Sequence, residues 1–191
     1  MSTSVIRPHL NLALLALAVA TTALPGHASP TQATDHSHAA AIGSPALAAQ
    51  ASRTVEVVMG DNYFEPEQLV IAPGETVRFV VRNEGSIVHE FNIGTPELHR
   101  RHQPEMRMML EHGMIELDKI HHDRMTMDMG NGHVMDHDEP NSVLLEPGQT
   151  AEVVWRFTGA DPLEFACNMP GHYESGMVGP IRLTQASPVG R

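Results

Sequence analysis

Residues 165–179, FACNMPGHYESGMVG, place three metal-binding side chains on one short loop. Cys167 is followed by His172 and then by Met177, with four residues in each interval. A thiolate, an imidazole and a thioether form a soft donor set, which suits copper and its Cu(I)/Cu(II) couple better than magnesium, calcium or manganese. Glycines between the donors allow the chain to turn, so we expect the three side chains to converge on one point.

A second imidazole has to come from elsewhere in the chain, and His89 is the candidate. It lies in the β-type run VHEFNI, near the end of a predicted strand that can neighbour the strand carrying Cys167. Two His and one Cys with a weak axial Met make the trigonal site of electron-transfer copper proteins. We therefore predict one mononuclear copper site, with the ligands His89, Cys167, His172 and Met177.

The first 28 residues have the features of a secretory signal peptide. Arg7 supplies a positive charge, residues 10–20 (LNLALLALAVA) are apolar, and Gly26-His27-Ala28 places small residues before a cleavage point. The apolar run is shorter than the roughly 20 residues of a membrane-spanning helix. We expect cleavage and export to the periplasm, and no membrane span in the mature form; an uncleaved anchor is the alternative.

Residues 29–52 are rich in Ala, Ser, Thr and Pro and are predicted to form a flexible linker. The linker carries His36 and His38, which are either solvated or a weak auxiliary metal site. The single cysteine of an exported chain has no disulfide partner within it, and metal ligation protects such a thiol from oxidation. The formal net charge of −11 argues against nucleic acid and anionic lipid as partners.

From Arg53 onward, short β-type runs alternate with turns such as Pro73-Gly74 and Pro147-Gly148, which is typical of an all-β sandwich. The predicted strands are 54–58, 68–71, 75–81, 88–93, 142–145, 150–157, 163–167 and 178–183. The side chains expected to face the core are those of Leu69, Val77, Phe79, Phe91, Val153, Trp155, Phe157 and Phe165. This domain is expected to span residues 53–185, with 186–191 as a C-terminal tail.

The sequence resembles the cupredoxin family over about residues 53–185, apart from residues 95–141. The resemblance rests on FEPEQLVIAPGETVRFVVRN, on SIVHEF with His89, and on CNMPGHYESGM, whose spacing is similar to that of rusticyanin-type members. It implies a Greek-key β-sandwich with one type 1 copper. Many cupredoxins follow the first His ligand with an Asn that ties the two ligand loops together, whereas Glu90 stands here. The reduction potential and colour are therefore not carried over.

Residues 95–141 interrupt the β pattern and hold eight of the 12 Met and seven of the 13 His. Residues 96–114 are predicted to be helical in part, with Pro104 interrupting the helix and Gly113 weakening its end. Such a long insertion is usually functional or disordered. It is similar to the His- and Met-rich segments of the CopI group of periplasmic copper-tolerance cupredoxins.

Thioether sulfur prefers Cu(I), and imidazole also binds Cu(II), so the insertion is a candidate accessory Cu(I)/Ag(I)-binding region. Met106, Met109 and His102 are spaced so that a helix could present them on one face. For Met106 and Met109, packing in an apolar core is the equal alternative. The remaining candidate ligands are His121, His122, Met125, Met127, Met129, His133, Met135 and His137.

Three functions compete. The first is copper tolerance with a redox-active centre, which the insertion, the His36/His38 tail and the acidic charge favour. The second is a dedicated one-electron carrier of a respiratory chain. For either function, copper ions and a periplasmic redox or copper-transfer protein are the candidate partners. The third is an enzyme, which we do not expect. A trinuclear copper centre needs a His beside the Cys, whereas Ala166 and Asn168 flank Cys167, and a binuclear CuA centre needs two Cys, whereas the chain has one. A weak cuprous oxidase activity of the insertion stays open.

Overall fold

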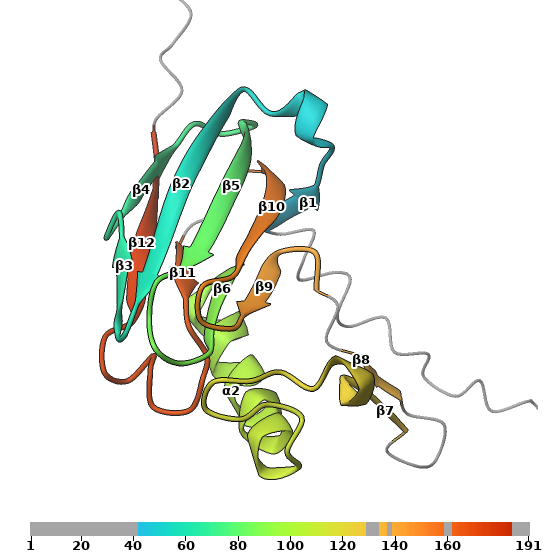
Figure 1. Cartoon of the computed structure of the whole chain (residues 1–191). Coiled ribbons are helices and arrows are strands. Elements are labelled where there is room, and N and C mark those ends of the chain that lie inside the picture. The colour runs from blue at the N-terminus through green and yellow to red at the C-terminus, as the bar shows by residue number, and fades with distance from the viewer. Residues whose placement is uncertain (1–41, 129–133, 137–138, 159–161, 185–191) are drawn as a thin grey trace, which may run out of the picture. The chain divides into compact units, whose positions relative to one another are not determined.

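The computed structural model describes residues 42–128, 134–136, 139–158 and 162–184, and these form two five-stranded sheets packed face to face (Figure 1). The first sheet has the order β1 (Gly43–Pro45), β10 (Thr150–Phe157), β5 (Thr76–Asn83), β2 (Arg53–Gly60) and β3 (Tyr63–Glu65). The second has the order β4 (Leu69–Ile71), β12 (Val178–Leu183), β11 (Leu163–Ala166), β6 (His89–Gly94) and β9 (Ser142–Leu145). The expected β-sandwich is confirmed.

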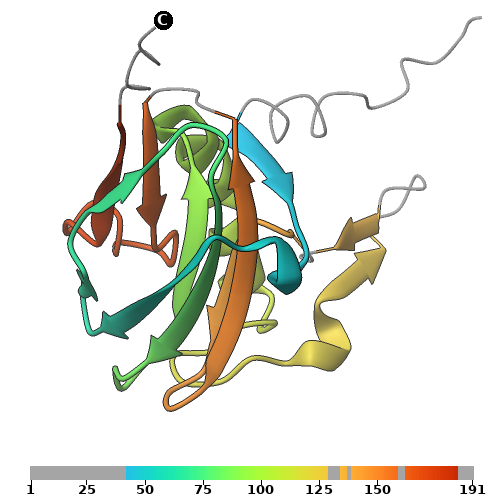
Figure 2. The same ribbon diagram turned by 90° about the horizontal axis from the view of Figure 1, so that it is seen from above.

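Strands that are distant in the sequence are neighbours in the second sheet. β6 pairs antiparallel with β11, in a register that sets Asn92 opposite Ala166, and β11 continues through a loop into β12. Figure 2 shows the two layers from above, with β10, β5 and β2 in one layer. This pairing places the start of β6 beside the end of β11, which is where His89 and Cys167 lie.

Alternation along the strands fills the space between the sheets with apolar side chains. All eight residues expected to face the core are buried, and all eight predicted strands are present with ends shifted by at most two residues. Phe91 lies near the centre, with ring centroids 5.4 Å from Phe79 and 5.7 Å from Phe165. The aromatic core therefore lies directly behind the strand that begins with His89.

The linker predicted over residues 29–52 is wrong over residues 43–50, where regular structure forms. Residues Gly43–Pro45 form β1, which pairs with β10, and Ala48–Gln50 form a short 3-10 helix, η1. Ile42 is buried, and its carbonyl accepts a hydrogen bond from Trp155 Nε1 at 3.2 Å. The buried indole N–H needs a partner, and this chain segment supplies it. Residues 29–41, with His36 and His38, lie outside the described residues, as do the predicted signal peptide at 1–28 and the predicted tail at 186–191.

Helix α2 (Pro96–Glu111) follows β6 and packs against β6 and β11 (Figure 1). Thr95 caps it by accepting a hydrogen bond from the Leu98 N–H at 3.2 Å, and Pro96 occupies the first turn. The helix continues through Pro104, although proline removes one backbone hydrogen bond. Its buried residues are His99, His102, Met106 and Met109. Burial of this face maintains the helix, and all six residues of β6 are consequently buried.

After α2 the chain contacts the loop that precedes His89. Ile115 and Ile120 form a β-bridge, and the Val88 N–H donates to the Leu117 carbonyl at 2.7 Å. The short helix η2 (His122–Arg124) and the hairpin β7 (Thr126–Asp128) and β8 (Val134–Asp136) follow. Met114, Ile115 and Ile120 are buried, so this part of the Met- and His-rich segment contributes to the core.

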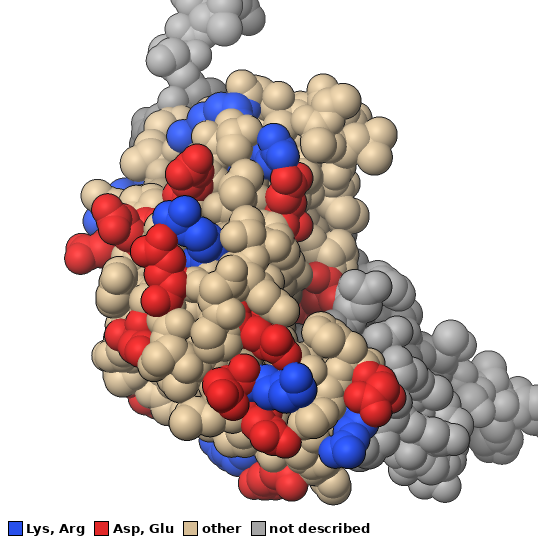
Figure 3. Space-filling view, viewed as in Figure 1, with Lys and Arg blue, Asp and Glu red and all other residues tan. Residues whose placement is uncertain are grey.

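Acidic and basic side chains are interspersed over the face shown in Figure 3. Arg53 pairs with Glu75 at 2.6 Å, and Arg78 on β5 pairs with Glu152 on β10. Within the part of the chain that the structure describes, no helix has the length and apolar character needed to cross a bilayer.

Candidate metal centre

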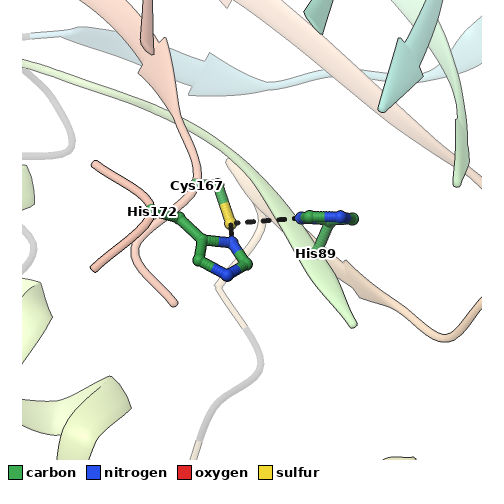
Figure 4. Close-up of side chains that lie close together, drawn as sticks. All are labelled: His89, Cys167 and His172. Atoms are coloured by element: carbon green, nitrogen blue, oxygen red, sulfur yellow. Dashed lines mark hydrogen bonds between the residues drawn. The ribbon is translucent and has the colours of Figure 1, made fainter. Parts of the chain in front are cut away.

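Three predicted ligands converge at one end of the sandwich (Figure 4). Cys167 Sγ lies 3.3 Å from His172 Nδ1 and 3.9 Å from His89 Nδ1, and the three atoms lie within 4.8 Å of one another. His89 begins β6, Cys167 follows β11, and His172 lies on the loop between β11 and β12. Two rigid strands and one tight loop therefore position the trio.

The spacing of these donor atoms suits a metal ion. With metal–ligand bonds of about 2.0–2.3 Å, donors around a trigonal centre are about 3.6 Å apart, and the two Sγ–Nδ1 distances of 3.3 and 3.9 Å bracket that value. Met177 is fully buried, and its carbonyl accepts a hydrogen bond from the Cys167 N–H at 3.1 Å. One thiol and two imidazoles, with a methionine whose backbone is hydrogen-bonded to that of the cysteine, are the donor types of a type 1 copper site.

The loop between β11 and β12 closes through its own backbone. The His172 N–H donates to the Met169 carbonyl at 2.9 Å, and the Met177 N–H donates to the His172 carbonyl at 2.9 Å. Gly171 and Gly176 have φ of 87° and 101°, a region that favours glycine. The turns that the sequence predicted ahead of His172 and Met177 are present. Because glycine occupies both positive-φ positions, neither turn strains the backbone.

The protonation of the donors follows from their burial. Burial raises the pKa of the Cys167 thiol to about 12, so the thiol keeps its proton at neutral pH until a metal displaces it. Burial lowers the pKa of His89 and of His172. Both imidazoles are therefore neutral near pH 7 and each offers a lone pair to a metal.

Asp61, which the sequence did not single out, orients His89. Its Oδ1 lies 3.1 Å from His89 Nε2, while Ser86 donates to Oδ2 from its hydroxyl at 2.6 Å and to Oδ1 from its N–H at 2.9 Å. Hydrogen bonds from Ser86 and His89 lower the pKa of Asp61 to about 2. Since Nε2 donates to Asp61, Nδ1 faces the sulfur as a lone pair. A Cβ on Gly85 would lie 2.4 Å from Asp61 Oδ1 and would push this carboxylate away from His89.

Replacing Asp61 with asparagine is expected to weaken copper binding about tenfold to a hundredfold, because a ligand imidazole loses its charged partner. Competition with a chelator of known affinity measures the change. Asp118→Asn, which alters an exposed aspartate, is the charge-matched control and should bind like the unaltered protein. Unchanged affinity in Asp61→Asn would show that Asp61 does not orient the ligand.

Glu90 joins the ligand strand to the ligand loop. Its side chain is fully buried, and Oε2 accepts hydrogen bonds from the Asn168 side chain at 2.8 Å and the Asn168 N–H at 3.1 Å. Oε1 accepts from Ser142 Oγ at 2.8 Å, Asn92 Nδ2 at 3.2 Å and His102 Nε2 at 3.0 Å. Glu90 thus makes the connection between the two ligand loops that an Asn makes in many cupredoxins.

The backbone of Glu90 also contacts the thiol, since its N–H donates to Cys167 Sγ at 3.3 Å. Burial acts to lower the pKa of His102, but the charge of Glu90 and hydrogen bonds to Glu105 and Glu90 outweigh it and raise that pKa to about 11. His102 is therefore an imidazolium that balances the buried carboxylate. Strand alternation places Glu90 on the outer face of β6, which would be solvated if α2 did not cover it.

The candidate accessory ligands that the structure describes lie on several different elements. Met106 and Met109 are fully buried in the apolar core, which favours the packing alternative for both. His121 Nε2 lies 2.7 Å from Glu116 Oε1 and Met125 packs partly against the core, whereas His122 begins η2. Met127 on β7 is opposite Met135 on β8 in the hairpin register. Met129, His133 and His137 lie outside the described residues.

The chain belongs to the cupredoxin family, and the resemblance stated from the sequence is confirmed. Residues 14–110, just over half of the chain, match the family description of a cupredoxin-like domain. The solved structure of auracyanin B superposes with a TM-score of 0.52 at 20% sequence identity, covering 74% of this chain and 96% of that one, which shows a shared fold.

Two relatives of known name are both copper-resistant cuproproteins called CopI. The copper-resistant cuproprotein CopI of Pseudomonas aeruginosa is 52% identical over 150 residues, which cover 75% of this chain and 83% of the relative. The copper-resistant cuproprotein CopI of Rubrivivax gelatinosus is 37% identical over 185 residues, which cover 95% and 98% of the two chains. The similarity to the CopI group that the sequence indicated is thereby confirmed.

Proposed function

We propose that this protein is a periplasmic copper-tolerance cupredoxin that binds one copper ion at a type 1 site. His89, Cys167 and His172 are the equatorial ligands and Met177 is the axial ligand. The observation that carries the proposal is the convergence of one sulfur and two Nδ1 atoms at the separations a trigonal metal requires. The names of the curated relatives at 52% and 37% identity support copper resistance as the process.

Bound copper would supply a one-electron Cu(I)/Cu(II) couple. The protein's part is to hold the donors in fixed positions and to exclude water. Cys167 and Met177 are fully buried. Asp61 orients His89, and Glu90 holds the loop after Cys167 through Asn168. Because these contacts hold the donors in fixed positions, little reorganisation is needed on a change of oxidation state.

Copper tolerance is favoured over a dedicated electron carrier by the Met- and His-rich segment at 95–141, an insertion that a simple carrier does not need. We infer that it offers accessory Cu(I)/Ag(I) binding through the hairpin methionines. The support is the composition of the segment and the pairing of Met127 with Met135 across β7 and β8. Weak cuprous oxidase activity would fit the same region, although we propose a binding protein and not an enzyme.

The accessory region is tested by two sets of Met→Leu substitutions. Leucine at Met106 and Met109 is expected to leave Cu(I) stoichiometry unchanged, because these side chains pack in the core and Leu conserves their volume. Leucine at Met125, Met127, Met129 and Met135 is expected to lower it by at least one ion per chain. Cu(I) is titrated under anaerobic conditions against a colorimetric chelator. Equal stoichiometry in both variants would remove the accessory site from the proposal.

Substitution is a sharper test than deletion of residues 95–141. That deletion would also remove Met106, Met109, Met114, Ile115 and Ile120 from the core. A loss of copper could then reflect unfolding of the domain.

The alternative is a one-electron carrier of a respiratory chain, favoured by one observation. His172 is partly exposed, whereas Cys167 is fully buried, so the imidazole connects the centre with the surface. A deletion strain separates the two functions. Loss of growth in copper-supplemented medium with normal respiration supports tolerance, while slow respiration in copper-poor medium supports the carrier.

A further inference from the structure

A second group of metal-binding side chains lies outside the proposed copper site. One nitrogen of His102 and one carboxylate oxygen each of Glu105 and Glu139 lie within 4.8 Å of one another. His102 and Glu105 are three residues apart on α2, and Glu139 approaches from the segment that leads into β9. All three lie within the Met- and His-rich segment 95–141, but none is a methionine, and the fold brings the two ends of that segment together.

The orientation of His102 is that of a metal ligand. Nε2 lies 3.0 Å from the buried carboxylate of Glu90, and Nδ1 faces Glu105 Oε2 at 3.2 Å. A ligand histidine generally donates its other ring N–H to a carboxylate, which fixes the ring and strengthens the donor nitrogen. In His102, Nε2 donates to Glu90. Nδ1 is therefore the nitrogen that would bind the metal, and it is directed toward Glu105, a second potential ligand.

The surroundings favour a cation at this position. His102 is 8% exposed and Glu105 is 31% exposed, so the group is largely shielded from water yet can be reached from the surface. The carboxylates of Glu90, Glu105 and Glu139 all act on the imidazole, which they hold as a cation in the metal-free protein. A metal ion would take the place of the Nδ1 proton, which is released to solvent.

From this geometry we propose a second metal site, formed by His102, Glu105 and Glu139, that takes a borderline divalent cation such as Cu(II) or Zn(II). One imidazole nitrogen and two carboxylate oxygens are donors for these ions and not for Cu(I), which prefers sulfur. The site therefore differs in chemistry from the proposed type 1 centre and from the methionine hairpin. Glu90 links it to the type 1 centre, since Oε1 contacts His102 and Oε2 holds Asn168 beside Cys167.

The test compares the full chain with Glu105→Gln/Glu139→Gln, which preserves shape and removes two ligands. The charge-matched control is Glu97→Gln/Glu111→Gln, which changes two exposed glutamates on the same helix. Each protein is dialysed against buffered Zn(II), and bound zinc is counted by elemental analysis. The site predicts one Zn(II) fewer in the first variant at the same free Zn(II), with at least tenfold weaker affinity, and no change in the control.

Cu(II) gives a second readout that is independent of the type 1 site. The added Cu(II) should show an ordinary tetragonal EPR signal that Glu139→Gln alone weakens, and thermal melting of the metal-free variants confirms that they fold. Equal zinc content in the full chain and in Glu105→Gln/Glu139→Gln, or an equal loss in the control, would overturn the proposal. Absence of the thiolate absorption band would count against the type 1 site and leave this second site standing.

Discussion

Replacing Cys167 with alanine is expected to abolish the intense visible absorption of the copper-loaded protein. That absorption arises from thiolate-to-copper charge transfer, and Cys167 is the only cysteine in the chain. The remaining equatorial donors, His89 and His172, are imidazoles and give Cu(II) only a weak visible band. The expected loss is essentially complete and is measured by absorption spectroscopy after addition of one equivalent of Cu(II).

Met177→Leu is the matched comparison, because it removes the other sulfur of the proposed site. The axial thioether is a weak ligand that tunes the reduction potential. The intense band should therefore persist in Met177→Leu while the reduction potential changes. If Cys167→Ala kept the band, or Met177→Leu lost it entirely, the assignment of equatorial and axial sulfur would be wrong.

The second large effect is expected at Glu90. Glu90→Ala should lower the free energy of unfolding of the metal-free protein by about 3–5 kcal/mol, because the buried imidazolium of His102 loses the carboxylate that accepts from its Nε2 and keeps its contact with Glu105. It also leaves the Asn168 N–H and side-chain amide without their acceptor. Urea denaturation followed by tryptophan fluorescence measures the change, since Trp155 is the only tryptophan and is fully buried.

Two variants provide the controls for Glu90. Glu90→Gln preserves the shape and one acceptor oxygen, so it should cost less than Glu90→Ala, about 1–3 kcal/mol. Glu56→Ala changes an exposed glutamate of β2 and should leave the urea midpoint unchanged. A Glu90→Ala protein as stable as Glu56→Ala would mean that the buried carboxylate does not hold α2 and the Cys167 loop to β6.

The β-sandwich could be predicted because its strands have strong local patterns. Val77, Phe79 and Val81 are buried at alternate positions of β5, and Pro-Gly turns mark the ends of the runs. The strand β1 could not be predicted, because GSP has no strand pattern and is held by pairing with β10 and by the Trp155 hydrogen bond. Its conformation is decided by a distant partner and not by its own residues.

The ligands could be predicted because their types and spacing are local, whereas the residues that support them come from elsewhere. Asp61 reaches His89 across 28 residues of sequence and shows no motif. Glu90 was noted as a departure from the family pattern, but its burial depends on α2 covering the outer face of β6. That covering helix was itself predicted to be interrupted at Pro104, because local propensity does not include the packing that maintains it.

The most direct test is to load the purified full-length protein with one equivalent of Cu(II) and to record its visible absorption and EPR spectrum together with its copper content. A site formed by His89, Cys167, His172 and Met177 predicts an intense thiolate-to-copper band, a type 1 EPR signal and one such centre per chain. An unmodified protein that binds copper with only weak visible absorption and an ordinary tetragonal EPR signal would contradict a type 1 site.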